Sequence, residues 1–276
     1  MEIIKSDGQI EPFNKVKFCG SLRKAGAPKE LADTICTRVE EKIPPGASTS
    51  RIYRAALRYL VKEKIEVAAR YSLHKGVAEL GPAGFVFEQY VEAILQAHGY
   101  YTKRDQIIKG KCVSHEIDLT AEEGKTHYLL ELKYHNEPGL RTHINVVMYA
   151  DARLLDIEKM ENKREKKRYQ HRMWLITNTK FTDTAIRYAK CRNITLTGWD
   201  FPKGNTLEDL ISRKKMYPVT VLPAVDPILL SKFAKDNLIL AQDLLPYEPG
   251  DLAKRYEITS LHAEKIINEA RGIMNL

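Results

Sequence analysis

Two short stretches in the middle of the chain carry the residue types that metal-assisted hydrolysis requires. They are His115 to Asp118 and Leu130 to Lys133, and the second contains an acid followed two residues later by a lysine. Alternate side chains of a strand share a face, so Glu131 and Lys133 should point together while the leucines beside them face a buried side. Carboxylates on two paired strands can hold a hard divalent cation such as Mg²⁺. A lysine beside that cation can orient or deprotonate a water molecule and offset charge that develops on a phosphate.

An acid-x-lysine pattern is common by chance, so the alternative is an ordinary sheet whose charged face is solvated. The surroundings favour the metal site. Asp118 lies between two large apolar residues, and Glu131 follows the apolar stretch 128–130. A predicted helix that carries Glu88 precedes both strands. The side chains of Asp118, Glu131 and Lys133 could therefore converge, with Glu88 as a third acid.

These residues resemble the PD-(D/E)xK nuclease superfamily, in particular its Mrr-like restriction endonuclease branch. That family has an acid in an early helix, an Asp on one strand and (Asp/Glu)-x-Lys on the next, which here corresponds to Glu88, Asp118 and the stretch from Glu131 to Lys133. The resemblance continues through Trp174 to Thr182 and Gly198 to Asp200. It covers roughly residues 83–215.

The resemblance implies a DNA endonuclease that uses Mg²⁺ or Mn²⁺. Asp118 and Glu131 would ligate the metal together with the Leu132 carbonyl. Lys133 would act on the attacking water, and Glu88 would support the metal or its water. Many Mrr-like proteins have Gln at the position of Glu131 and glycines ahead of the Asp, so this site would be the Glu variant, and no sequence preference carries over.

Two neighbouring features allow alternatives. His135 and His143 are candidate proton-transfer groups, although a packing or surface role is more common for histidine in such positions. A basic run lies between the predicted core helix and the next strand, and consists of Lys159, Lys163, Arg164, Lys166, Lys167, Arg168 and Arg172. It is either a solvated helix end or a phosphate-binding segment. Phosphate contacts would weaken steeply with salt.

The first 80 residues carry a second group of candidate binding residues. The pattern of Lys5, Asp7-Gly8, Phe13 and Lys17 resembles the start of an ATP-cone, the regulatory nucleotide-binding module of ribonucleotide reductases and their transcriptional repressor. Further along, residues 48–52 and 68–71 extend this likeness to about residue 80.

The resemblance implies that ATP or dATP binds as an effector. The candidate nucleotide ligands are Lys5, Glu11, Asn14, Lys17, Thr49 and Lys75. Lysines near the N-terminus would supply charge to a triphosphate, the threonine would donate a hydroxyl, and Glu11 or Asn14 would bond to the sugar or base. Ser6 stands where the module usually has a second basic residue, so the alternative is a module that has lost its ligand.

We therefore expect an α/β protein in three parts. These are a mainly helical ATP-cone at 1–82, a restriction-endonuclease-like αβββαβ core at 83–215 and a small α-helical unit at 216–276. The core should contain helices at 85–98, 141–162 and 181–191, and strands at 100–108, 113–120, 127–134, 173–177 and 194–197. The last unit should contain helices near 227–236, 238–245, 249–256 and 260–272. Residues 258–270 faintly resemble half of a helix-hairpin-helix, but the hairpin glycines are missing, so we favour a packing or protein-interaction role.

Composition limits the class of protein. The chain has 276 residues, with 44 Lys and Arg against 36 Asp and Glu, and its charge of +8 favours a polyanionic partner. No apolar run approaches the roughly 20 residues that span a bilayer, and the N-terminus has no signal-like pattern, so we expect no membrane association and a cytoplasmic location. The four scattered cysteines include no CxxC pair, and we expect them to be reduced.

The main hypothesis is a Mg²⁺-dependent DNA endonuclease that ATP or dATP regulates. Because one active site cuts one strand, cutting both strands would need two copies, and the protein could act as a nucleotide-controlled homo-oligomer. The alternative is a nucleotide-responsive DNA-binding regulator with an inactive nuclease core. An RNA or structure-specific nuclease would use the same residues.

Overall fold

The computed structural model describes the chain except for residues 1, 6–7, 81–83, 138, 162–169 and 276. Its contacts group the residues into two compact units. The first contains Met1–Leu73, Val221–Leu230 and Leu244–Leu276, and the second contains His74–Thr220 and Ser231–Asp243. Residues 216–276, which we expected to form a third unit, are thus divided between these two.

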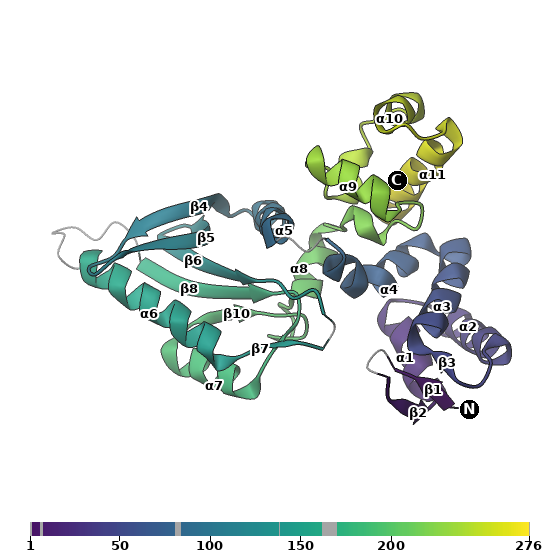
Figure 1. The fold of residues 1–276 in the computed structure, drawn as a ribbon, viewed down its shortest axis with the longest axis horizontal. Coiled ribbons are helices and arrows are strands. Elements are labelled where there is room, and N and C mark those ends of the chain that lie inside the picture. Colours follow the sequence, from purple (N-terminus) through teal and green to yellow (C-terminus); the bar gives the residue numbers. More distant parts are fainter. Residues whose placement is uncertain (1, 6–7, 81–83, 138, 162–169, 276) are drawn as a thin grey trace. The chain divides into compact units, whose positions relative to one another are not determined.

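The first unit opens with a small sheet followed by helices (Figure 1). Its strands are β1 (Glu2–Ile4), β2 (Ile10–Pro12) and β3 (Ala47–Ser48), and its first helices are α1 (Lys15–Lys24), α2 (Lys29–Lys42), α3 (Thr49–Glu63) and α4 (Ile65–Ala78), whose last turn lies beyond the division. Strand β1 lies between β2, which is antiparallel to it, and β3, which is parallel. The described residues of this N-terminal segment are therefore mainly helical, as predicted.

Side-chain caps fix the starts of α1 and α3, and both helices pack into one apolar core. The Asn14 side chain accepts the Lys17 N–H at 2.8 Å at the start of α1, and Ser48 caps α3 in the same way. Leu22 and Leu60 are fully buried in the shared core.

A disulfide joins α1 to α2. It links Cys19 and Cys36, whose Cα atoms lie 5.8 Å apart. Our expectation of reduced cysteines was therefore wrong for this pair, while Cys112 and Cys191 are free and exposed. The two cysteines are 17 residues apart and lie on neighbouring helices, so no CxxC motif marks the pair in the sequence.

The C-terminal part of the chain is helical. It contains α9 (Pro227–Lys235), α10 (Pro249–Tyr256) and α11 (Ser260–Met274), with short 3₁₀ turns at Val219–Val221 and Ala241–Leu244. The predicted helix at 238–245 was wrong, since only the 3₁₀ turn forms there. In the first unit, Gly272 of α11 lies so close to Ile65 that a Cβ atom would approach the Ile65 side chain to 2.6 Å.

The second unit is built on a five-stranded mixed sheet of order β10-β8-β6-β5-β4. Its strands are β4 (Tyr101–Lys109), β5 (Ser114–Glu123), β6 (Thr126–Lys133), β8 (Gln170–Thr177) and β10 (Thr195–Thr197), and its helices are α5 (Gly84–Ala97), α6 (Ile144–Glu161), α7 (Asp183–Arg192) and α8 (Leu207–Lys214). Antiparallel pairing joins β4, β5 and β6, and parallel pairing adds β8 and β10. This order confirms the predicted αβββαβ core. Two-residue strands β7 (Arg141–Thr142) and β9 (Lys180–Phe181) pair separately.

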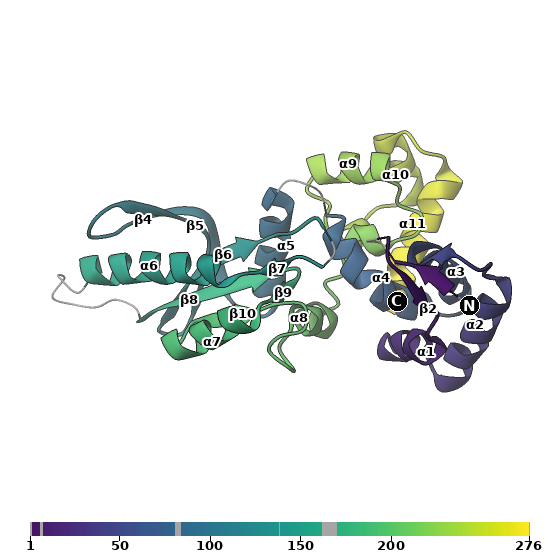
Figure 2. The same ribbon diagram turned by 60° about the horizontal axis from the view of Figure 1, so that its bottom comes forward.

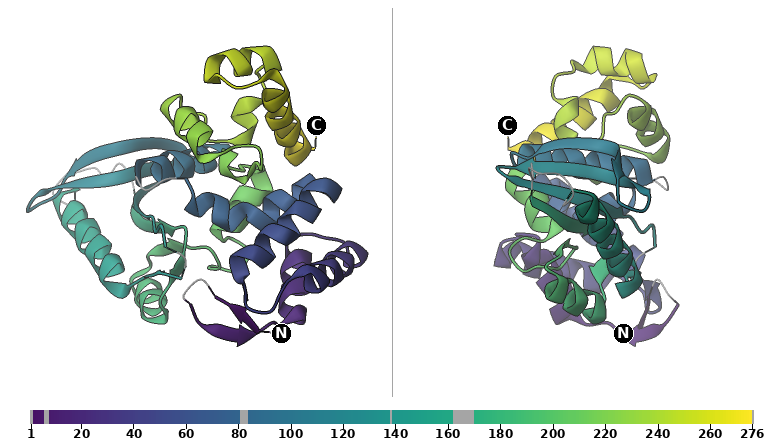
Figure 3. Two further views of the ribbon diagram at one scale, coloured as in Figure 1. Left: turned by 45° about the vertical axis from the view of Figure 1, so that its right-hand side comes forward. Right: turned by 90° about the vertical axis from the view of Figure 1, so that its left-hand side faces the viewer.

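Helices α6 and α7 lie side by side along the sheet (Figures 1 and 2). They share a buried core with β5, β6, β8 and β10, in which Leu129, Val147 and Ala185 are fully buried. Strands β4 and β5 form a long hairpin (Figure 3). Within the described residues, no helix has the length and apolar character that crossing a bilayer requires.

Candidate active site

The register of β5 and β6 brings the two predicted metal ligands to neighbouring positions. The last pair in this part of the ladder is Leu119 with Leu130, so the next residues on the two strands are Asp118 and Glu131. Opposite positions on antiparallel strands share a face of the sheet. In addition, the Asp118 carboxylate accepts the Leu132 N–H at 2.7 Å, which fixes this side chain of β5 to the backbone of β6.

Burial and mutual repulsion act on three carboxylates from three elements. Burial raises the pKa of Asp118, and the Leu132 N–H and the charge of Arg153 oppose this shift. The pKa of Glu131 is raised by burial and then by the charge of Asp118. The pKa of Glu88, on α5, is also raised by burial first and by Asp118 second. Asp118 therefore influences both of the other predicted acids, and burial disfavours the charged form of all three.

Lys133 lies at the end of β6, where it is exposed. Its positive charge is one of the influences that lower the pKa of Glu131, after Arg153. The lysine is therefore near the carboxylate pair and accessible to a ligand from solvent.

Arg153 is a site residue that the sequence analysis missed. It lies on α6 and forms an ion pair with Glu131, and both side chains are about one-fifth exposed, at 20% and 19%. Its guanidinium also lies 4.6 Å from the centre of the Tyr149 ring, one helical turn earlier. The spacing of Tyr149 and Arg153 could have predicted their contact. The pairing with Glu131 depends on how α6 packs on the sheet, which the sequence does not reveal.

Asp105 is a second site residue that could not be identified from the sequence. It lies in β4 between the pairs Arg104–Leu119 and Gln106–Ile117, so its register position is opposite Asp118. Its φ of 54° is in the left-handed region, which is uncommon for a residue other than glycine and more tolerated by Asp. The charge of Asp105 contributes to the raised pKa of both Asp118 and Glu88.

Helix α6 also fastens the tip of the β4–β5 hairpin through Asp156. Its carboxylate lies 2.9 Å from His115 Nε2 and accepts the backbone N–H groups of Cys112 and Val113. The hydrogen bond from His115 is the main reason that the pKa of Asp156 lies well below its usual range. Gly110 is required beside it, because a Cβ atom there would lie 2.1 Å from the Asp156 carboxylate.

The two histidine candidates differ in setting. The His135 backbone N–H donates to Asn178 Oδ1 at 2.8 Å, and the Asn178 amide donates back to the His135 carbonyl at 2.7 Å. Its ring contacts Thr142, and burial together with the charges of Lys133 and His143 lowers its pKa. His135 thus has a clear packing role. His143 is exposed.

Most of the basic run lies outside the described residues. This applies to Lys163, Arg164, Lys166, Lys167 and Arg168. Lys159 is exposed at the end of α6, and Arg172 is half-buried in β8. Phosphate binding by this run stays a prediction.

The acidic pair fits a magnesium or manganese ion by its donor chemistry. Both ligands are carboxylates, and burial raises the pKa of each, so a bound cation would favour their ionised forms. Mg²⁺ commonly binds one or two carboxylates and keeps several waters or substrate phosphates. Among the residues that the structure describes, no three His, Cys, Asp or Glu side chains form a ready metal-binding group.

The structure gathers four of the six predicted nucleotide ligands around one cavity. Glu11, Asn14, Lys17 and Thr49 line a space of about 210 Å³ in the first unit. Lys5 is adjacent, since it pairs with Glu11 at 2.7 Å. The Asn14 oxygen is engaged in capping α1, which leaves its amide NH₂ as the group that can donate to a ligand.

The same cavity has an aromatic wall, none of whose residues was among the predicted nucleotide ligands. Tyr53 and Tyr71 stack with ring centres 5.3 Å apart, and Phe13 and Phe18 also line the space. Burial raises the pKa of Tyr71. Lys75, the sixth predicted ligand, belongs to the second unit and pairs with Glu79 at 3.3 Å.

A mixed sheet with two acids and a lysine on adjacent strands defines a nuclease-like domain of the restriction-endonuclease class. Residues 82–207 match the restriction endonuclease family, and residues 1–77 match the ATP cone domain. The chain therefore belongs to the restriction endonuclease family and carries an N-terminal ATP cone.

The similar sequence and the similar solved structure that were found both carry no assigned function. An uncharacterized protein of Archaeoglobus fulgidus is 34% identical over 181 residues, which make up 66% of this chain and 98% of that protein. A crystal structure of a protein of unknown function is 33% identical with a TM-score of 0.54, and the match covers 69% of this chain and 98% of that one.

Proposed function

We propose that this protein is a Mg²⁺-dependent DNA endonuclease that hydrolyses phosphodiester bonds and is regulated by ATP or dATP bound to its ATP cone. The observation that carries the proposal is the coupling of Asp118, Glu131 and Lys133 on two adjacent strands. One fold can support several activities, so the function depends on the residues of the site rather than on the fold.

Each residue has a role that follows from its chemistry. Asp118 and Glu131 would hold the metal, and Glu88 would support it or a water molecule bound to it. A bound Mg²⁺ would polarise the phosphate and lower the pKa of a bound water. Lys133 would orient the attacking water and stabilise negative charge on the phosphate oxygens as the bond breaks. Arg153 fixes the Glu131 carboxylate through its ion pair.

The nucleotide would bind in the cavity that Glu11, Asn14, Lys17 and Thr49 line. Lys17 would neutralise part of the triphosphate charge, and the aromatic wall would contact the base. Since one active site cuts one strand, nucleotide-controlled association of two copies would couple this pocket to double-strand cleavage. Gel filtration with and without ATP and dATP tests that coupling.

The alternative is a nucleotide-responsive DNA-binding regulator, and one observation favours it. Arg153 already neutralises part of the charge of Glu131, which would weaken a metal site. Both functions require DNA binding, but only the nuclease requires Lys133.

Cleavage of supercoiled plasmid separates the two. Methylated and unmethylated DNA would be incubated in Mg²⁺ or Mn²⁺, with and without ATP, and wild type compared with Asp118→Ala and Lys133→Ala. We expect metal-dependent nicking or linearisation that both substitutions abolish while DNA binding is retained. DNA binding without cleavage under every condition would support the regulator.

A further inference from the structure

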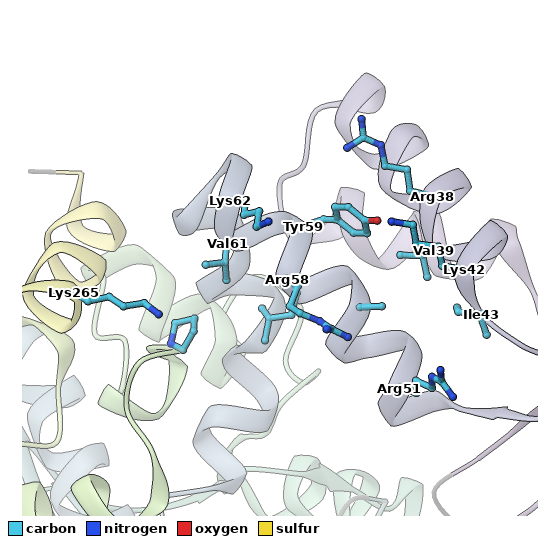
Figure 4. A pocket seen from close by; sticks show the side chains of 13 residues that line it. Arg38, Val39, Lys42, Ile43, Arg51, Arg58, Tyr59, Val61, Lys62 and Lys265 are labelled. Atoms are coloured by element: carbon cyan, nitrogen blue, oxygen red, sulfur yellow. The ribbon is translucent and has the colours of Figure 1, made fainter. Parts of the chain in front are cut away.

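A second cavity in the first unit has a strongly basic lining. Its volume is about 580 Å³, and helices α2 and α3 supply most of its walls (Figure 4). The cationic residues that line it are Arg38, Lys42, Arg51, Arg58, Lys62 and Lys265. No Asp or Glu is among the described residues that line this basic pocket. It shares none of these residues with the cavity proposed to bind the nucleotide.

The charges in the basic pocket are not neutralised by neighbouring acids. All six cationic side chains are exposed, and none forms an ion pair with a carboxylate in the described part of the chain. The contrast is Lys15 on α1, which pairs with Glu40. The charge of Lys265 is one influence that lowers the pKa of buried Glu269, although the two side chains form no ion pair in the described part of the chain. Like charges gathered in this way repel one another until an anion binds.

The cations are arranged along helix faces around an apolar floor. Arg38 and Lys42 are four residues apart on α2, and Arg58 and Lys62 have the same spacing on α3, so each pair lies on one helix face about 6 Å apart along the axis. Arg38 and Lys42 both lie over the Tyr59 ring, at 5.8 and 5.7 Å from its centre (Figure 4). Exposed cations spread over α2, α3 and α11 match a ligand with repeated phosphates better than a single phosphate group.

We propose that the basic pocket binds the phosphate backbone of DNA, so that the first unit anchors the polymer on which the second unit acts. This proposal rests on the proposed nuclease function for its choice of polymer. The chemistry is charge complementarity with counterion release, which requires no base recognition. A tethered anchor raises the local concentration of DNA at the catalytic unit without adding contacts there.

The test measures binding of a fluorescent DNA duplex to the full chain in EDTA across a range of salt concentrations. Arg58→Ala/Lys62→Ala removes two cations from the pocket. Lys29→Ala/Lys254→Ala is the matched control, since it removes two exposed cations of the same unit that do not line the pocket. Loss of two phosphate contacts should reduce the slope of log K against log salt by about 1.8 and weaken binding at 0.1 M salt by roughly tenfold or more. The control should bind like wild type.

Equal affinity and equal slope for the pocket variant and wild type would overturn the proposal. So would a fall in ATP stoichiometry by one, measured by calorimetry, with DNA binding unchanged, because the pocket would then hold a free nucleotide. If Arg58→Ala/Lys62→Ala fails to fold by circular dichroism, Arg38→Ala/Lys42→Ala provides the same test. Plasmid cleavage by wild type in Mg²⁺ is scored separately. Reduced DNA binding by the variant with no cleavage by wild type would uphold the anchor and refute the nuclease, and the reverse pattern would do the opposite.

Discussion

Replacing Asp118 with Asn should stabilise the metal-free protein while removing its response to magnesium. Burial and neighbouring acids raise the pKa of Asp118, so its ionised form is disfavoured in the folded state. A neutral amide of the same shape removes that unfavourable charge, and its oxygen can still accept the Leu132 N–H. We expect a gain of about 1 kcal/mol in the free energy of unfolding at pH 7, in the range of substitutions that relieve strained functional sites.

The difference in the free energy of unfolding between Asp118→Asn and wild type should depend on pH. A carboxyl group whose pKa is higher in the folded state makes folding less favourable above that pKa, and the penalty disappears as the pH falls toward its unfolded value of about 4. The difference between Asp118→Asn and wild type should therefore be full at pH 7 and vanish near pH 4. A gain of 1 kcal/mol corresponds to roughly 2–4 °C in Tm for a domain of this size.

Magnesium should stabilise wild type and leave Asp118→Asn nearly unchanged. If Mg²⁺ binds wild type with a Kd of about 1 mM, then 10 mM Mg²⁺ stabilises it by about 1.4 kcal/mol. Asp118→Asn lacks one of two metal ligands and should show little of this shift. Differential scanning calorimetry in EDTA and in Mg²⁺ measures both effects, and Glu137→Gln, an exposed acid in the loop after β6, is the charge-matched control.

Two results would refute this reasoning. A lower Tm for Asp118→Asn in EDTA would show that the carboxylate is stabilising, contrary to its raised pKa. An equal rise in Tm with Mg²⁺ in wild type and Asp118→Asn would show that any bound ion lies elsewhere.

Three further predictions concern other parts of the molecule. Arg153→Ala leaves the half-buried Glu131 without its ion-pair partner, so calorimetry should show a loss of about 1–3 kcal/mol in EDTA that Mg²⁺ partly restores, and equal losses in both conditions would contradict this. Lys17→Ala should weaken ATP binding about tenfold by calorimetry, because it removes a charge-assisted contact to phosphate, and unchanged affinity would move the nucleotide to another site. Reduction of the Cys19–Cys36 disulfide should lower the free energy of unfolding of the first unit by about 3 kcal/mol in denaturant titrations with and without dithiothreitol, whereas protein that contains only free thiols by mass spectrometry would exclude the bond.

The order of elements in the nuclease core could be predicted because each element is encoded locally. The strands β4, β5 and β6 alternate or carry continuous apolar residues, and turn residues separate them. The acid-x-lysine spacing was sufficient to place Glu131 and Lys133 on one strand. The antiparallel pairing of β5 and β6 across their short turn then sets Asp118 opposite Glu131.

Features that depend on tertiary packing could not be predicted. The residues 141–142 continue a helical pattern but form β7, because β9 pairs with them almost forty residues later. Arg153 meets Glu131 only because α6 packs along the sheet, and Asp105 approaches the site through a local left-handed backbone conformation. The cavity near Asn14 shows the converse, since its polar ligands were predicted while its aromatic wall was not.

The distribution of charge explains why a nuclease of this kind would need an anchor away from its active site. Three carboxylates, Glu88, Asp118 and Glu131, lie in that site, and in their ionised forms without a cation they would repel the phosphates of DNA. The net charge of +8 is therefore unevenly distributed, and DNA should be attracted to some parts of the surface and repelled by others. The basic pocket concentrates six cations that no carboxylate partner in the described chain neutralises, and its attraction for phosphate does not depend on metal. Metal-independent DNA binding and metal-dependent cleavage would then arise from separate groups of residues, so we expect that each can be removed without the other.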